Sequence, residues 1–247
     1  VNNYTPKEYS AGAQNWGAVQ DDKGILYFAN QRGVLQFDGI NWNLIPVLDD
    51  RTVFKIVIDD SNTIWCGIQN DFGYLSTNPI GEYIYVSCQN LLPDSIKPVG
   101  KVRWIHIMGD TSYFQSSKYL IRKIGENIKV WEAETVFYRQ HVINNVVHFY
   151  KSRKGLEIIR NDSLILKSDF PLDSSDPPTS IFSYGNNNLF ISTWKNGLYK
   201  VINGRNEKFI TEIDNELKSN PVIDAKYISP NMFILAGFNG GSYLIDT

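Results

Sequence analysis

Basic and aromatic side chains recur in six short turn segments of the sequence, and together they could hold an anionic sugar. The segments read NQRG, QNDFG, SSK, KSRKG, TWKNG and GFNGG. An aromatic ring can stack on a sugar ring, and cations can pair with a carboxylate or sulfate that the sugar carries. The candidate ligand-binding residues are Arg32, Asp71, Phe72, Lys118, Arg153, Lys154, Trp194, Lys195, Phe238 and Asn239. The competing interpretation is that these are ordinary solvated turns, which are commonly charged.

These segments recur because the sequence itself repeats. Five later stretches resemble LYFANQRGVLQFDG: IWCGIQNDFGYLST, SYFQSSKYLIRKIG, VHFYKSRKGLEIIRND, LFISTWKNGLYKVING and MFILAGFNGGSYLID. Spacings of 40, 45, 37, 42 and 44 residues separate the equivalent turn positions, which are Gly33, Gly73, Lys118, Gly155, Gly197 and Gly241. Another apolar run precedes each pair of runs, and a fourth follows most of them. Four short strands per repeat of about 40 to 50 residues are typical of a β-propeller blade.

We therefore expect an all-β fold, a β-propeller of four-stranded blades, with five complete blades and most of a sixth in one domain over residues 1–247. The second strands are apolar on both faces, as in Ile25–Phe28, which fits sheets packed between neighbouring blades. Residues near Tyr4–Tyr9 could supply the missing outer strand and close a six-bladed ring, or the chain could be an arc of a larger propeller. The blades are expected to start near Trp16, Phe54, Trp104, His141, Ile181 and Val222.

Composition and charge narrow the class of partner. Aromatic residues make up 13% of the chain, the formal net charge is -2 and the pI is about 6.0. A nearly neutral chain is not expected to bind nucleic acid or an anionic membrane. No stretch approaches the roughly 20 apolar residues that span a bilayer, and VNNYTPKEYS lacks the features of a signal peptide. The chain is expected to be either cytosolic or an already processed ectodomain.

The turns of the repeat are expected to lie at two opposite ends of the blades. In a blade, the turn between the second and third strands opens on the same face as the connection to the next blade, so the six basic and aromatic segments should share that face. Two long connections, CQNLLPDSIKPVGK and KSDFPLDSSDPPTS, should lie there too, and they either carry function or cover the edges of blades. The opposite face receives the acidic turns DDKG, DDSN and MGD.

The opening of the chain carries a resemblance to a known family. The stretch NYTPKEYSAGAQNWGAVQDDKGILYFANQRGVLQFDG resembles the start of the N-terminal periplasmic sensor propellers of bacterial two-component and hybrid histidine kinase receptors, which are built from regulator-propeller repeats. The family blade runs as aspartate, two residues, glycine, then lWvGT, and the second blade here has Trp65 and Gly67 at the family positions. The third and fourth blades depart from it, with Lys118 in place of glycine and no tryptophan at Tyr113 or His148.

The resemblance implies a periplasmic or extracellular ligand-sensing segment of a membrane receptor. Its partners would be a small-molecule or glycan ligand and the neighbouring propeller and sandwich domains of the same receptor, with room for a homodimer of the full receptor. No cofactor, no nucleic acid and no direct membrane contact are implied. The output chemistry of such receptors lies in other domains, so this segment is not expected to be an enzyme.

Aspartate and histidine positions offer little for a metal. Asp59–Trp65, DDSNTIW, resembles the aspartate-box turn of other propellers, in which the carboxylate ties down the hairpin. A calcium ion would need several converging oxygen ligands, but each turn offers one or two. His106, His141 and His148 match no zinc spacing, and His106 and His148 fall in apolar strands, which favours core imidazoles.

The two cysteines are expected to be free and buried. Cys66 falls on a second strand and Cys88 at the end of the fourth strand of the same blade. Two strand spacings, roughly 10 Å, exceed the Cα separation that a disulfide can bridge.

The sequence contains no nucleophile elbow, phosphate loop or paired carboxylates in a suitable local context. We therefore expect binding of a small-molecule ligand, such as an oligosaccharide, rather than catalysis. Two alternatives stay open. A protein-docking scaffold would expose an apolar patch of several hundred Å², and a propeller glycosidase or lyase would bring two carboxylates, or a tyrosine and a carboxylate, together near the channel mouth.

Overall fold

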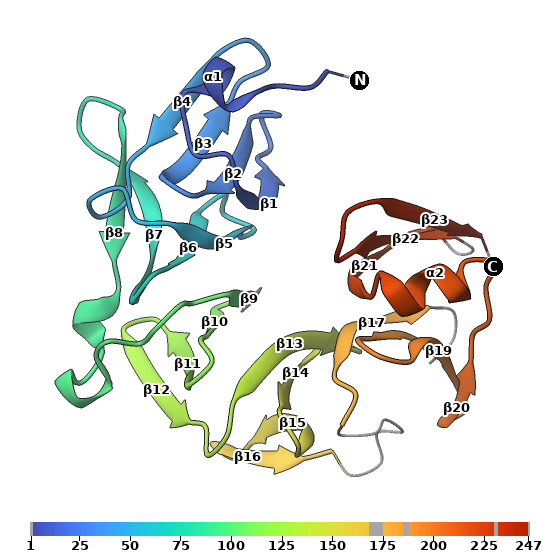
Figure 1. The fold of residues 1–247 in the computed structure, drawn as a ribbon. Helices are drawn as coiled ribbons and strands as arrows, with labels where there is room; N and C mark the ends of the chain where they lie inside the picture. The colour runs from blue at the N-terminus through green and yellow to red at the C-terminus, as the bar shows by residue number, and fades with distance from the viewer. Residues whose placement is uncertain (1, 168–174, 185–187, 230–231, 247) are drawn as a thin grey trace. The chain divides into compact units, whose positions relative to one another are not determined.

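Each apolar run of the repeat forms one strand of an antiparallel meander, in which strands that follow each other in the chain are neighbours in the sheet (Figure 1). The structure is a computed structural model that describes residues 2–167, 175–184, 188–229 and 232–246. Within these residues five sheets have four strands and the sixth has three. The expected all-β blade architecture, with five complete blades and most of a sixth, is confirmed.

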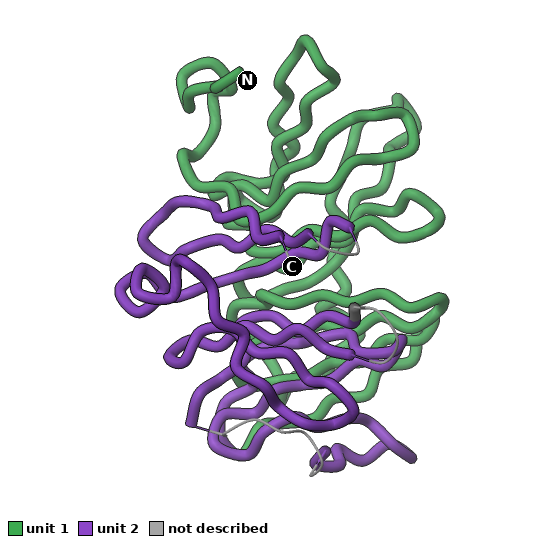
Figure 2. The backbone as a smooth tube through the Cα atoms, turned by 90° about the vertical axis from the view of Figure 1, so that its right-hand side faces the viewer, with its two compact units in different colours: residues 1–134 green, residues 135–247 purple. Residues whose placement is uncertain are grey.

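The chain divides into two compact units, residues 1–134 and 135–247, which are coloured separately in Figure 2. Unit 1 begins with a short helix, α1 (Pro6–Tyr9), and contains three blades. The strands of unit 1 are β1 (Asn15–Gln20), β2 (Leu26–Asn30), β3 (Gly33–Phe37), β4 (Trp42–Ile45), β5 (Val53–Ile58), β6 (Ile64–Ile68), β7 (Asp71–Thr77), β8 (Tyr83–Ser87), β9 (Trp104–Met108), β10 (Thr111–Gln115), β11 (Tyr119–Ile124) and β12 (Asn127–Glu132).

Unit 2 contains the other three blades and a second helix, α2 (Asp214–Ser219), in the connection that leads to the last blade. Its strands are β13 (Phe137–Ile143), β14 (Val146–Lys151), β15 (Gly155–Arg160), β16 (Ser163–Leu166), β17 (Pro178–Tyr184), β18 (Asn188–Thr193), β19 (Gly197–Ile202), β20 (Arg205–Lys208), β21 (Val222–Ser229), β22 (Met232–Gly237) and β23 (Ser242–Asp246).

The hydrophobic core of each unit lies between successive blades. In unit 1, one cluster joins the first and second blades through Tyr27 and Ile56, and another joins the second and third through Phe72 and Phe114. In unit 2, equivalent clusters join the fourth blade to the fifth and the fifth to the sixth. The sheets are buried on both faces where two blades flank them, which explains why the second strands read as continuous apolar runs.

An aspartate ties down the turn between the first and second strands of a blade. The Asp59 carboxylate accepts hydrogen bonds from the backbone N–H groups of Ser61 (3.0 Å) and Thr63 (2.9 Å). In the first blade Asp21 accepts equivalent bonds from Lys23 and Ile25. The prediction that DDSNTIW is a folding element is therefore confirmed.

In the first blade, the third strand starts at a position where a side chain does not fit. Gly33 has a φ of +139°, and a Cβ atom there would lie 2.4 Å from the carbonyl oxygen of Ile45. Glycine is the residue that tolerates both this backbone conformation and this close approach.

The N-terminal segment covers the first blade instead of completing the sixth. Tyr4 and Tyr9 pack their rings on Trp42 of β4, with centroid separations of 5.2 and 5.4 Å. The backbone N–H of Thr5 donates a 2.6 Å hydrogen bond to Glu8, and this turn with Pro6 favours a helix over a strand. The option that Tyr4–Tyr9 forms the outer strand of the sixth blade is therefore wrong, and β23 is an edge strand of a three-stranded sheet.

The fourth and fifth blades begin earlier than the expected starts near His141 and Ile181. β13 begins at Phe137 and β17 at Pro178, and a β-bulge follows each start. A bulge breaks the strict alternation of apolar and polar residues, so the pattern does not reveal the first residues of these strands.

The first long connection covers the core. Between Cys88 and Lys101 it forms two short 3-10 helices, Gln89–Leu91 and Asp94–Ile96. Leu92 and Val99 are buried in the cluster between the second and third blades. In the second connection, residues 168–174 lie outside the described residues.

The cysteines and one histidine behave as expected. Cys66 and Cys88 are free and buried. His148 is buried, and its Nδ1 lies 2.9 Å from the carbonyl oxygen of Val146. His141 is its buried cross-strand partner, and His106 is half-buried on β9. Among the described residues no group of three His, Cys, Asp or Glu side chains is arranged to hold a metal ion.

Candidate functional site

In unit 2, the turn between β22 and β23 lies against the connection from the fifth blade. The backbone N–H of Asn239 donates to the side-chain oxygen of Asn220 at 2.7 Å, and its amide Nδ2 donates to the carbonyl of Ser219 at 3.0 Å. The N–H of Phe238 donates to the carbonyl of Pro221 at 2.9 Å. Turn and connection therefore share one end of the sixth blade, as the meander requires.

Two aromatic rings from adjacent blades meet at this end. Trp194 precedes β19, and its ring packs edge-on against that of Phe238, with centroids 5.3 Å apart and an interplanar angle of 74°. The Phe238 side chain is 59% exposed, and Trp194 is half-buried. The face of Phe238 is thus available to a ligand, whereas Trp194 buttresses it.

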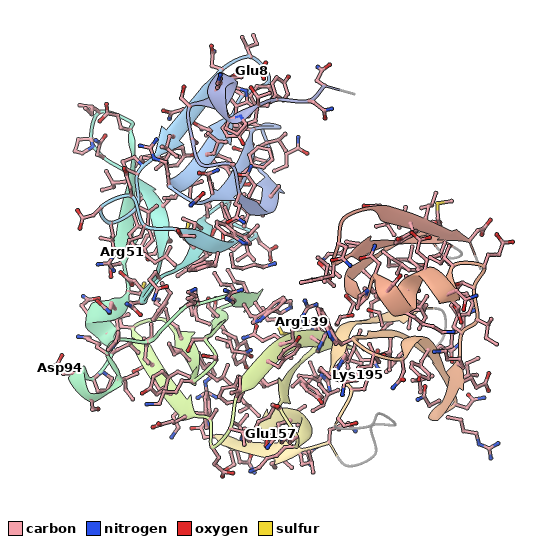
Figure 3. All side chains as sticks on the ribbon, viewed as in Figure 1. Glu8, Arg51, Asp94, Arg139, Glu157 and Lys195 are labelled. Carbon is pink, nitrogen blue, oxygen red and sulfur yellow. The ribbon has the colours of Figure 1, made fainter. Side chains whose placement is uncertain are left out.

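A buried carboxylate positions the turn that follows Trp194. Asp176 is 3% exposed and accepts hydrogen bonds from the backbone N–H groups of Lys195 (2.8 Å) and Asn196 (3.0 Å). The Lys195 ammonium donates to the carbonyl of Ser175 at 3.1 Å, and Figure 3 shows this lysine at the start of β19. The two bonds to Asp176 fix the backbone of Lys195 beside the ring pair.

Next to Lys195, a hollow of about 170 Å³ opens between the fifth blade and α2. We call it the lysine hollow, and it is lined by Lys195, Asn196, Gly197, Lys208, Asp214, Leu217 and Lys218. Three ammonium groups face one carboxylate, so the lining carries an excess of two positive charges. The hollow is large enough for one anionic group of a ligand, but smaller than the pockets that enclose a whole drug-sized molecule.

The single carboxylate of the hollow is held ionised. Partial burial raises the pKa of Asp214, but hydrogen bonds from the hydroxyl and N–H of Thr211, together with the nearby charges of Lys208 and Lys218, outweigh it and lower the pKa overall. Lys218 donates to the side chain of Asn215 at 2.9 Å, and Lys208 donates to the carbonyl of Asn196. Asp214 cancels only part of the lysine charge, so the hollow favours an anion.

The structure brings together Trp194, Lys195, Phe238 and Asn239 among the predicted site residues. Sequence reasoning missed Lys208 and Lys218, which lie at the end of the fourth strand of the fifth blade and on α2. The signal was available in EKFITEI and NELK, because both stretches precede the sixth blade on the candidate face. Neither lysine lies in a turn between the second and third strands of a blade, to which the predicted site residues were confined.

The other predicted residues have different surroundings. Arg32 pairs with Asp50 at 3.5 Å and Lys118 with Glu132 at 3.1 Å, both on the surface. Arg153 and Lys154 are exposed in the turn between β14 and β15.

Asp71 and Phe72 are the first two residues of β7 and lie in the protein interior, not in a turn. Phe72 is fully buried, with its ring 4.4 Å from that of Phe114. Asp71 is 1% exposed and accepts a 2.7 Å hydrogen bond from the Ser87 hydroxyl, and burial raises its pKa. Neither side chain presents a surface to a ligand.

Unit 1 has a larger, acidic cleft at the opposite ends of its strands. It has a volume of about 490 Å³ and lies between the second and third blades. Asp59, Asp60 and Asp110 line it, with Trp65 and Lys123. The Lys123 ammonium lies 5.5 Å from the centroid of the Trp65 ring and donates to the carbonyl of Gly125 at 2.6 Å.

No family model matches the sequence, and no curated protein is similar to it. Solved structures, in contrast, match nearly the whole chain. Two are crystal structures of the extracellular domains of hybrid two-component systems from B. thetaiotaomicron. The first is 14% identical, with a TM-score of 0.71 over 96% of this chain and 32% of that one, and the second is 16% identical, with a TM-score of 0.70 over 95% and 34%. The fold is that of a β-propeller.

A propeller enzyme has a similar fold. Virginiamycin B lyase from Staphylococcus aureus, in a catalytically inactive form with quinupristin, is 14% identical, with a TM-score of 0.71 over 96% of this chain and 81% of that one. Identities this low show the fold and not the activity of either neighbour. This propeller spans about a third of the length of the two extracellular domains. None of the described helices is long and apolar enough to cross a bilayer.

Proposed function

We propose that this propeller is the extracytoplasmic ligand-sensing part of a two-component signalling receptor, and that it binds an anionic oligosaccharide at the lysine hollow. Support for the receptor role comes from the likeness to extracellular domains of hybrid two-component systems, which are about three times as long as this chain. The neighbouring domains of the same receptor would be its protein partners.

The observation that carries the binding role is the lysine hollow beside an exposed ring. A carboxylate or sulfate would enter the hollow and meet three ammonium groups. The sugar that bears it would lie over the exposed face of Phe238, because aromatic rings stack on the apolar faces of sugars. A neutral sugar would use only the ring, so the site discriminates by charge.

Signalling requires that the ligand bind one receptor state more tightly than another. The hollow is lined by α2, which belongs to a connection between blades, and by a turn and a strand end of the fifth blade. A bound anion would attract the lysine side chains of all three elements and so draw the elements together. The receptor would sense that shift at the surface of the propeller.

The test is calorimetric titration of the purified chain with uronic, sulfated and neutral oligosaccharides. We expect acidic glycans to bind, with an affinity that falls as salt is raised. The double variant Lys208→Gln and Lys218→Gln should lose about tenfold or more in affinity, whereas Lys226→Gln, an exposed lysine on β21, should bind as the wild type does. Unchanged binding in the double variant would remove the lysine hollow as the site.

A protein-docking scaffold is the second candidate, because the outer face of the sixth blade exposes apolar side chains. Ile234 on β22 and Leu244 on β23 are direct cross-strand partners and are 38% and 61% exposed. If this face binds a second copy of the chain, sedimentation should show association that Leu244→Lys abolishes. A wild type that is monomeric at all concentrations would rule out that self-association.

A further inference from the structure

In unit 1, three side chains converge on the ring of Phe54. The Trp16 ring lies 5.4 Å from it between centroids, at an interplanar angle of 59°. The Arg103 guanidinium carbon lies 5.2 Å and the Lys101 ammonium 5.5 Å from the Phe54 centroid. We call Trp16, Phe54, Lys101 and Arg103 the Phe54 platform.

The platform sits at one end of three successive blades. Trp16 and Phe54 are the second residues of β1 and β5, and Arg103 directly precedes β9. These are the first strands of their blades, so their starts lie at the end where connections arrive from preceding blades. The backbone of Arg103 is fixed by a 3.0 Å hydrogen bond to the carbonyl of Gln115, and Lys101 is bridged to Gln69.

The groups of the platform are accessible. Trp16 is 38% exposed, Lys101 and Arg103 are exposed, and Phe54 is half-buried. Phe54 therefore acts as the base of the platform, and Trp16 presents the largest free aromatic surface.

Two positive charges surround one ring without a carboxylate partner. None of the ion pairs formed by the described residues includes Lys101 or Arg103. A third cation, Arg51, donates to the carbonyl of Gln69, the residue bridged to Lys101, and Figure 3 labels it. The ring quadrupole offsets part of the repulsion between the two cations. An anion that binds between them would offset more of it.

We propose that the Phe54 platform is a second ligand site, which binds a carboxylated sugar ring. The sugar stacks on Trp16, and its carboxylate lies between Arg103 and Lys101. A bare inorganic anion would leave the exposed indole unused, and a neutral sugar would leave both cations unused. The guanidinium fork matches the planar geometry of a carboxylate and donates two hydrogen bonds to it, which favours a carboxylate over a sulfate.

This site is independent of the lysine hollow. The platform belongs to unit 1 and the hollow to unit 2, and they share no residue. The platform offers an arginine and an exposed indole, whereas the cations of the hollow are lysines and the exposed ring beside it is a phenylalanine. Variants in one site therefore leave the other intact.

The experiment uses the full chain and trigalacturonate, a trisaccharide of a uronic acid, followed by calorimetry and tryptophan fluorescence. Maltotriose serves as the neutral control and sodium sulfate as the inorganic anion. We expect trigalacturonate to bind and to change the fluorescence of the exposed Trp16, with neither effect from maltotriose. Sulfate should compete weakly, because it cannot stack.

The double variant Lys101→Gln and Arg103→Gln should weaken trigalacturonate binding at the platform about tenfold or more. Trp16→Ala should abolish the fluorescence change. Arg160→Gln, an exposed arginine at the end of β15, is the matched control and should have no effect. Circular dichroism verifies that each variant is folded.

Three results would overturn the proposal. The first is wild-type affinity in the Lys101→Gln and Arg103→Gln variant. The second is competition by sulfate as strong as that by trigalacturonate. The third is loss of all binding in the Lys208→Gln and Lys218→Gln variant, since the lysine hollow would then account for every bound ligand. If only the proposal for the lysine hollow is wrong, the Lys101→Gln and Arg103→Gln variant should still weaken trigalacturonate binding by the full amount.

Discussion

The indole Nε1 of Trp65 donates a 2.8 Å hydrogen bond to Oδ2 of Asp59, six residues earlier in the chain. Its counterpart in the first blade is the hydroxyl of Tyr27, which donates to Oδ2 of Asp21 at 3.2 Å. In both blades the aspartate uses its other oxygen for the backbone of the turn. A single carboxylate thus joins a hairpin turn to an aromatic side chain of the second strand.

Replacing Asp59 by alanine should therefore destabilise unit 1. The N–H groups of Ser61 and Thr63 and the indole of Trp65 lose their acceptor. At roughly 1 kcal/mol for each bond, the free energy of unfolding should fall by about 2 to 3 kcal/mol. Urea denaturation measures it, and Asp60→Ala, at the exposed next residue, should change it by less than about 0.5 kcal/mol. Equal losses in both variants would contradict the role of Asp59.

The same carboxylate makes stability depend on pH. Partial burial raises the pKa of Asp59, but the hydrogen bonds from Trp65, Ser61 and Thr63 outweigh it and lower the pKa overall. A carboxyl group with a lower pKa in the folded chain stabilises the fold above its unfolded pKa of about 3.9 and loses that effect as the pH falls through the folded value. The stability difference between wild type and Asp59→Ala should therefore be larger at pH 7 than at pH 3. A constant difference would show that the charge of Asp59 contributes nothing.

Truncation of Phe72 should reduce stability, whereas truncation of Phe238 should reduce ligand binding. Phe72 is fully buried against Phe114, so Phe72→Ala should cost about 3 to 5 kcal/mol in unfolding free energy. Phe238 is 59% exposed, and Phe238→Ala should cost less than about 1 kcal/mol while it weakens binding of acidic glycans. Thermal unfolding and calorimetric titration of both variants separate the two roles.

Neither thiol should react in the folded chain. Burial raises the pKa of Cys66, and it raises the pKa of Cys88 to about 11. At pH 8 about one Cys88 thiol in a thousand would be ionised, and both sulfurs are shielded from reagents. A thiol-reactive disulfide reagent should modify both cysteines after denaturation in guanidinium, and neither before. Fast reaction of Cys88 in the native chain would show that its environment opens.

The blade pattern could be predicted from sequence because its causes are local. The alternation of apolar and polar residues, the turn glycines and the Asp59 turn each act within a few residues. Each can therefore be recognised within a single repeat. The N-terminal segment could not be placed in this way. The rings of Tyr4 and Tyr9 pack on Trp42, which lies more than thirty residues later in the sequence. A contact at that separation leaves no local pattern that would place the segment.

The candidate site was only half accessible to the same reasoning. Trp194, Lys195, Phe238 and Asn239 stand in turns that the repeat identifies. Asp71 and Phe72 occupy the matching positions of the second blade, but there β7 begins two residues earlier than the turn glycine and draws them into the core. Lys218 lies on α2, in a connection outside the repeat, so no equivalent position in the other blades predicts where it lies.

The position of the hydrophobic clusters between blades has a consequence for how such a chain can change over generations. Since each cluster within a unit takes buried residues from two successive blades, the loss of one blade would expose the buried face of its neighbour, and an exchanged blade would have to match the faces on both sides. Insertions at the connections must spare the connection residues that belong to a cluster, such as Leu92 between the two 3-10 helices and Leu217 on α2.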